Sequence, residues 1–115
     1  MARGSREPMT VRADLLRGHL DSFVLATLED RPRHGYAIAE EIARRGNALL
    51  EVPSGTLYPA LHRLERAGWI TSEWSVVEGR RRRTYSLTGS GRRELARQRR
   101  RWADLSRTVT AVLGP

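Results

Sequence analysis

Four consecutive arginines, Arg80 to Arg83, form the densest cluster of charge in the chain. A guanidinium donates paired hydrogen bonds that match a phosphate group, so such a cluster is suited to bind a polyanion. On either side, residues 69–74 and 84–88 alternate in β-forming character, which predicts a β-hairpin with a basic loop over residues 75–83. Because neighbouring side chains of an extended strand point to opposite faces, we expect two of the four arginines to reach one backbone or minor groove. A solvated loop without a partner is the alternative.

A second set of groups suited to nucleic acid lies on the helix predicted after Pro53. Leu57, Leu61 and Leu64 are spaced to form one apolar face of this helix. Ser54 is the predicted N-cap, and the missing N–H of a proline costs least near the first turn, so the helix should begin at Ser54 or within two residues after it. The opposite face keeps groups that bond base edges or phosphates, namely Thr56, Tyr58, Pro59, His62, Arg63 and Arg66.

The sequence contains no pattern typical of a catalytic or metal-binding site. The chain has no cysteine, which excludes disulfides, thiol catalysis and Cys-ligated metals. The three histidines, His19, His34 and His62, lack the spacing of metal ligands, and no residue sits in a nucleophile motif. We therefore expect no enzyme, no metal and no cofactor.

The basic surplus is confined to the last third of the chain. The 115 residues carry a net charge of +8, and every basic residue is an arginine. Residues 1–78 hold 10 arginines and 11 acids, whereas residues 79–115 hold 11 arginines and two acids. Such a segment favours nucleic acid as the partner, with an anionic membrane surface second. Because no apolar run approaches the ~20 residues of a membrane span and no signal peptide is visible, we expect a cytoplasmic protein without membrane contact.

The order of elements predicts how these groups are positioned. Residues 1–11 have no periodicity and are predicted to be a flexible tail. Apolar spacing over residues 11–29 indicates a first helix that Pro32 ends, and a second short helix runs from His34 to the terminating pair Gly46-Asn47.

The third helix is followed by the hairpin and then by a long helix from about Ser90 to Leu113, with Thr88 as its cap. We therefore predict a mainly α (α+β) fold. Its parts are a winged helix-turn-helix over residues 12–88, with a two-stranded β wing, and a C-terminal dimerisation helix over residues 89–115.

Several motifs together resemble the PadR family of bacterial transcriptional regulators, over about residues 15–113. The motifs are His34-Gly35-Tyr36, the run from Gly55 to Leu61 with Arg63-Leu64-Glu65, Gly68-Trp69-Ile70, and Tyr85-Ser86-Leu87-Thr88 behind the arginines. Thr84 departs from the pattern, because the family often has an aromatic residue there. The single C-terminal helix is similar to the short branch of the family.

The resemblance implies a homodimeric repressor whose recognition helices and wings bind a palindromic operator in double-stranded DNA. It also implies DNA contacts at the positions of Tyr36, Ser54, Thr56, Tyr58, Pro59, His62 and Arg63. The arginines of the wing, Arg80, Arg81, Arg82 and Arg83, complete the predicted DNA-binding set.

The last helix gives an independent reason to expect a dimer. Heptad a and d positions counted from Leu95 are apolar at five of six places, and none holds an arginine. A helix of about 24 residues spans roughly 36 Å, more than one small winged domain covers, so a second copy is the simplest partner. The alternative is an amphipathic helix lying on its own fold. The predicted dimerisation residues are Leu16, Leu20, Leu95, Trp102, Leu105, Val109 and Val112.

Trp102 lies in the middle of this apolar stripe. In short PadR-type regulators that respond to drugs, an aromatic residue on this helix lines an apolar pore between the protomers. The resemblance thus implies that Trp102 stacks an aromatic effector, and an ordinary packed tryptophan is the alternative. Two other functions compete with operator binding: a winged-helix module that docks proteins, and an RNA reader, which the few aromatic residues disfavour.

Overall fold

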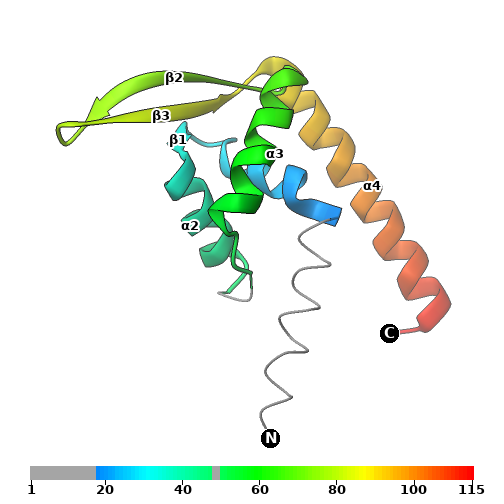
Figure 1. Cartoon of the computed structure of the whole chain (residues 1–115). Helices are drawn as coiled ribbons and strands as arrows, with labels where there is room; N and C mark the ends of the chain where they lie inside the picture. The colour runs from blue at the N-terminus through cyan, green and yellow to red at the C-terminus, as the bar shows by residue number, and fades with distance from the viewer. Residues whose placement is uncertain (1–17, 48–49) are drawn as a thin grey trace, which may run out of the picture.

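The computed structural model describes residues 18–47 and 50–115; the predicted tail and Leu16 lie outside these ranges. The chain is helical over residues 18–27, here called the first helix. The later elements, in order, are β1 (Arg33–His34), α2 (Gly35–Arg45), α3 (Ser54–Arg66), β2 (Ile70–Val77), β3 (Arg80–Leu87) and α4 (Gly89–Leu113). This is the predicted winged helix-turn-helix with a long C-terminal helix: α3 stands beside the β2–β3 hairpin, and α4 leads away from both (Figure 1).

One apolar core joins the helices to the base of the sheet. The predicted stripe of α3 is buried in it, since Leu57, Leu61 and Leu64 are almost completely inaccessible. Ile38 and Ile42 contribute the inner face of α2, and the sheet adds Ile70 and Tyr85. The core therefore fixes α3 by one face and leaves the other face free, as the spacing of its leucines predicts.

The ends of α2 and α3 follow the predicted signals, with one exception. Gly46 caps α2, and Asn47 follows with a left-handed φ of 57°. The N-cap of α3 is Pro53, so Ser54 is the first helical residue and the prediction of Ser54 as cap is wrong. A helix that begins this early places Pro59 sixth, where the carbonyl left without its usual partner lies in the exposed first turn.

The hairpin differs from the prediction of short strands and a basic loop. The strands β2 and β3 extend to a two-residue turn, Glu78-Gly79, in which both φ angles are positive, 53° and 76°. Such a turn matches the twist of paired strands, so pairing continues to Arg80 opposite Val77. The four arginines are therefore strand residues with alternating directions, and the β-branched Val76 and Val77 belong to the strand opposite them.

The sheet also has a third strand that we did not predict. The strand order is β1-β3-β2, and β1 pairs antiparallel with β3 through Arg33 opposite Tyr85 and His34 opposite Thr84. Two residues are too few to give an alternating pattern, which is why the sequence indicated a two-stranded wing. The consequence is that His34 belongs to a strand and caps α2, where a helical start was expected.

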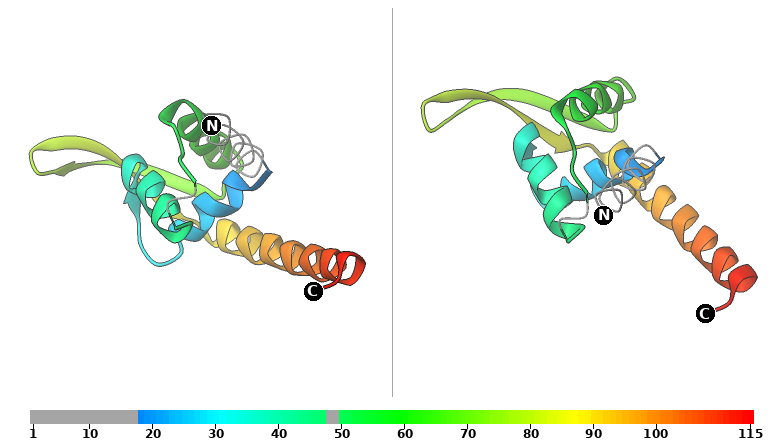
Figure 2. Two further views of the ribbon diagram at one scale, coloured as in Figure 1. Left: turned by 90° about the horizontal axis from the view of Figure 1, so that it is seen from below. Right: turned by 60° about the horizontal axis from the view of Figure 1, so that its bottom comes forward.

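The start of α4 is fixed at the base of the hairpin. As predicted, the Thr88 hydroxyl caps the helix: it accepts from the Gly91 amide at 2.9 Å and donates to the Gly68 carbonyl at 2.7 Å. A side chain at position 91 would lie 2.0 Å from the Trp69 carbonyl oxygen, so only glycine permits this approach. From here α4 extends beyond the domain (Figure 2). Among residues 18–47 and 50–115, every helix is too short or too polar to cross a membrane.

Arginines also hold the end of the first helix against its neighbours. Arg33 donates to the Thr27 carbonyl at 2.8 Å and Arg45 to the Ala26 carbonyl at 3.1 Å. Such bonds satisfy carbonyls that a helix end leaves without partners. Arg33 and Arg45, which belong to the part of the chain with nearly equal numbers of basic and acidic residues, thus stabilise the fold.

Candidate nucleic-acid interface

The face of α3 opposite its buried leucines is open to solvent. Pro59, His62 and Arg66 lie on the side most distant from the core, and Tyr58 is half exposed on the flank. Ser54 and Thr56 are exposed in the first turn. This side of the helix therefore presents the hydroxyl, imidazole and guanidinium groups that the sequence indicated.

Arg63 lies on the opposite flank of α3. Its guanidinium donates to the Asp21 carboxylate of the first helix at 2.7 Å. The arginine is exposed, but in this structure its charge is paired within the chain. Of the predicted contact residues on α3, Arg63 is the one whose polar group is already bound to another element.

A tight contact joins α2 to α3 below the hairpin. A Cβ at Gly35 would lie 2.6 Å from the Tyr58 hydroxyl oxygen, so the glycine lets the tyrosine pass against the start of α2. Tyr36 follows and is exposed beside it. The His-Gly-Tyr motif thus has a physical reason, since its glycine permits the packing and its tyrosine is left at the surface.

His34 connects α2 with the hairpin, and the sequence did not single it out as a site residue. Its Nδ1 accepts from the Ala37 amide at 3.3 Å, and Arg82 Nη1 lies 3.3 Å from the same atom. The ring stacks on Tyr36 with 6.5 Å between centroids. Burial lowers the pKa of His34, and the charge of Arg82 lowers it further. The neutral ring therefore serves as an acceptor where α2, β1 and β3 meet.

The arginines of β3 divide between the two faces of the hairpin. Arg83 and Arg81 share a face with Tyr85, whereas Arg80 and Arg82 share the face of Thr84. Arg83 pairs with Glu65 of α3 at 3.6 Å. One face is thus linked to α3, and the other is linked to α2 through Arg82 and His34.

The predicted dimerisation residues fall into two groups. Leu20 and Leu95 lie in the core of their own chain, Leu95 with 2% exposure, so they leave almost no surface for a second copy. Their inclusion in the seam is corrected: the first turns of α4 pack on the same domain, which a heptad count along one helix does not reveal. The remaining members within the described residues are exposed on α4, namely Trp102, Leu105, Val109 and Val112.

Trp102 lies where α4 leaves the domain. It is 56% exposed, and its ring meets His19 edge-on at 5.4 Å between centroids. One turn before it, Gln98 donates to Glu94 at 2.7 Å and accepts from Ser22. The tryptophan thus has one side on its own first helix and one side free.

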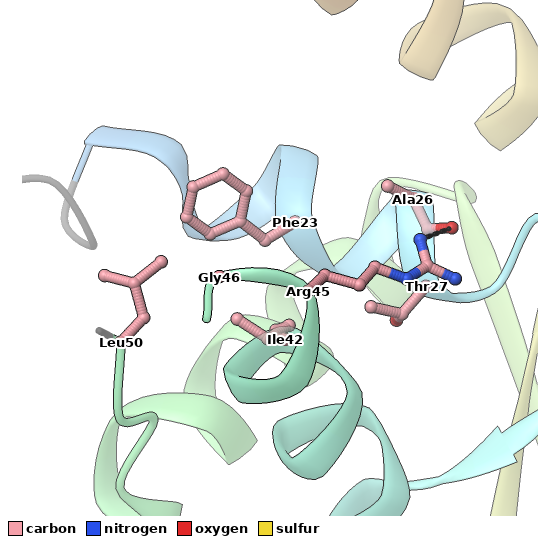
Figure 3. A pocket seen from close by; sticks show the side chains of 7 residues that line it. All are labelled: Phe23, Ala26, Thr27, Ile42, Arg45, Gly46 and Leu50. Atoms are coloured by element: carbon pink, nitrogen blue, oxygen red, sulfur yellow. Dashed lines mark hydrogen bonds between the residues drawn. The ribbon is translucent and has the colours of Figure 1, made fainter. Parts of the chain in front are cut away.

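A separate pocket opens between the first helix and the end of α2 (Figure 3). It encloses about 180 Å³, and its walls are mostly apolar. The Arg45 guanidinium at its edge is bound to Glu41 and to the Ala26 carbonyl. The residues that line it are Phe23, Ala26, Thr27, Ile42, Arg45, Gly46 and Leu50, and none of them belongs to a predicted site.

Comparison with known proteins identifies the family. The model of the transcriptional regulator PadR-like family matches residues 24–97. Transcriptional regulator Rv3488 of Mycobacterium tuberculosis is 43% identical over 86 residues, which cover 75% of this chain and 78% of the relative. The crystal structure of a PadR family transcriptional regulator from Eggerthella lenta superposes with a TM-score of 0.82 at 30% identity, covering 99% of this chain and 98% of the other.

A transcriptional regulator from Clostridium thermocellum superposes with a TM-score of 0.78 at 29% identity, covering 89% of this chain and 99% of that one. The likeness to these structures includes the winged domain and the C-terminal helix, since nearly the whole of both chains is covered. The family match covers well over half of the sequence. The chain therefore belongs to the PadR-like family of transcriptional regulators.

Proposed function

We propose that the protein is a homodimeric repressor that binds a palindromic DNA operator and releases it when an aromatic molecule binds. The observation that carries the proposal is the juxtaposition of two surfaces. The free side of α3 presents Tyr58, His62 and Arg66, and the hairpin with its four arginines stands directly beside it (Figure 1). In this arrangement α3 enters the major groove, and the hairpin follows the adjacent backbone.

The proposal of a homodimer is supported by the second half of α4. Its apolar stripe lies on the part of the helix that extends beyond the domain, and Val112 near its end is 77% exposed. Contiguous apolar surface of this kind marks an interaction site. A second copy covers it symmetrically and places two recognition helices about one turn of DNA apart, roughly 34 Å.

The proposal of an effector is supported by the surroundings of Trp102. The free side of its ring lies on the stripe that the second copy would cover, so two such rings can enclose a flat apolar molecule. His19 and Gln98 bring polar groups close to it. Binding between the protomers changes the spacing of the recognition helices and hence the affinity for an operator.

Replacement of a base-reading side chain tests operator binding. Footprinting on the DNA upstream of the protein's own gene defines the operator, and the dissociation constant is then measured for operator and for a random duplex. His62→Ala should weaken operator binding by about 1–3 kcal/mol, as the loss of one specific base contact does, and change random-duplex binding much less.

The matched control is Thr110→Ala, an exposed threonine near the end of α4, which should change neither constant. Equal losses on operator and random duplex would contradict the base-reading role of His62. If the protein gives no footprint at low salt but still binds another protein, the result would favour the alternative function, a winged-helix module that docks proteins.

A further inference from the structure

Trp74 is an exposed tryptophan in the middle of the hairpin, and no function considered so far uses it. It is 55% exposed, although tryptophan is among the side chains whose removal from water is most favourable. Two arginines of β3 cover its ring: Arg81 Cζ lies 4.8 Å and Arg83 Cζ 5.6 Å from the ring centroid. The ring thus holds two guanidinium groups on one face of the strand pair.

The register explains how these side chains come together. Trp74 lies directly opposite Arg83, and Val76 lies opposite Arg81, so all four project from the same face. Val76 is 71% exposed. These four residues, here called the tryptophan face, combine two cations with an aromatic and a β-branched side chain, beyond the base of the sheet that the core covers.

The tryptophan face continues into the flank of α3. Arg83 Nε donates to Ser72 Oγ at 2.8 Å, and Ser72 Oγ donates to Glu65 at 2.6 Å. Glu65 lies one helical turn after His62 and two turns after Tyr58 on α3. The face and the recognition helix therefore form one surface, and the Glu65 carboxylate within it is already paired with Arg83.

The opposite face of the hairpin is less suited to a polyanion. It carries Arg80 and Arg82, but Glu73 stands opposite Thr84 on the same side. The Arg82 guanidinium lies against the His34 ring. A phosphate that approaches this face meets the exposed carboxylate of Glu73. The Arg82 guanidinium is also already in contact with His34, the N-cap of α2.

We propose that the tryptophan face is the side of the hairpin that meets duplex DNA. Trp74 and Val76 pack on deoxyribose rings, while Arg81 and Arg83 bond the phosphates on either side. This inference rests on the proposed function and adds to it which face of the wing is used. The partner is duplex DNA because the face is cationic, has no unpaired carboxylate among the described residues, and is continuous with α3.

Two double variants of equal charge test the choice of face. Arg81→Ala with Arg83→Ala removes the cations of the tryptophan face, and Arg80→Ala with Arg82→Ala removes those of the other. Each pair loses one arginine that is tied to another element and one that is not, so the two are matched. The probe is a mixed-sequence duplex of about three helical turns, titrated by fluorescence anisotropy at several salt concentrations.

We expect the first pair to lower the slope of log affinity against log salt by about 1.8 per bound protomer, and the second pair to lower it much less. An equal or larger loss in the second pair would overturn the inference. If neither pair changes the slope while His62→Ala still weakens operator binding, this inference fails and the proposed function stands. If the unaltered protein binds neither operator nor mixed duplex, the proposed function itself fails.

The tryptophan is tested separately, because an alanine there also releases both arginines. Trp74→Phe keeps a ring and should lose little affinity, whereas Trp74→Ala should lose about tenfold, because it removes both the apolar contact and the ring that holds the two guanidinium groups. Circular dichroism checks that both variants are folded. Tryptophan fluorescence should change on adding the duplex in the unaltered protein, and the change should shrink in Trp74→Phe. Full affinity in Trp74→Ala would overturn the contact.

Discussion

The hairpin and α4 contain all 11 arginines of the basic third of the chain, yet they use them differently. In the hairpin the four arginines are consecutive residues of β3 that alternate between its two faces, and only Arg83 is paired with a carboxylate among the described residues. In α4 several arginines form ion pairs within the chain. Arg99 binds Glu29 after the first helix at 2.9 Å, and Arg97 and Arg107 each bind an acidic residue one turn earlier in α4. Arg92 donates to the Glu29 carbonyl at 3.3 Å, and the remaining arginines of α4 are Arg93, Arg100 and Arg101.

This difference shows that net charge alone does not locate a nucleic-acid surface. The arginines of α4 without a carboxylate partner among the described residues lie on a helix that runs away from α3 and the hairpin (Figures 1 and 2). The opposite side of that helix bears the exposed apolar stripe. This contrast supports the proposal that the hairpin meets DNA and that α4 meets a second copy.

The largest effect should come from a charge placed in the apolar stripe of α4. Leu105→Glu puts a carboxylate where two copies are proposed to meet, and an unpaired buried charge costs about 3–5 kcal/mol. Multi-angle light scattering at several concentrations should then show a monomer, and circular dichroism should show an intact fold. Arg100→Glu, on the side of the same helix opposite the stripe, is the control and should remain dimeric.

A dimer that survives Leu105→Glu, or an unaltered protein that is monomeric at every concentration, would contradict the assignment of α4. If the division of roles is right, operator affinity should also fall steeply in the Leu105→Glu variant. The reason is that two half-sites are then bound independently.

A smaller effect should come from the imidazole that links the hairpin to α2. Burial, together with the nearby Arg82, lowers the pKa of His34, while Glu40 opposes the shift. The folded state thus favours the neutral ring. Its contribution to stability is fully present above the unfolded pKa, about 6.5, and is lost as the pH falls through the lowered pKa of the folded state.

Urea unfolding between pH 7.5 and 5 should show this loss of stability. His34→Asn keeps a side-chain acceptor at the N-cap but does not titrate, so its stability should depend less on pH in this window. Carboxylates such as Glu41, whose pKa is lowered to about 2 by Arg44 and Arg45, stay ionised there. Identical pH dependence in both proteins would show that His34 is not the responsible group.

Much of the fold could be predicted because its signals are local. The spacing of Leu57, Leu61 and Leu64 correctly indicated the buried face of α3, and Thr88 and Gly46 correctly marked helix ends. Strand β1 could not be predicted, because two residues carry no periodicity and its pairing partner lies about 50 residues away. The predicted strands are shorter than the observed ones, because a run of charged residues is typical of a loop, whereas the Glu78-Gly79 turn supports paired strands up to its ends.

The candidate site was predicted by residue type, and its geometry was not. Exposure of His62 follows from helical spacing, since it lies opposite the leucines, and Tyr58 on the flank is half exposed. That Arg63 is bound to Asp21, or that Arg82 meets His34, depends on contacts between distant segments. The same holds for Leu95, which belongs to the heptad pattern but is buried in its own domain.

The division between hairpin and α4 is tested most directly by two triple variants of equal charge. One replaces Arg80, Arg81 and Arg82 of the hairpin with glutamine, and the other replaces Arg93, Arg100 and Arg101 of α4. The salt dependence of duplex binding is measured for both. We predict that the hairpin variant lowers the log–log slope by about 1 to 3 per protomer and that the α4 variant leaves it unchanged. An equal or larger decrease in the α4 variant would contradict the account.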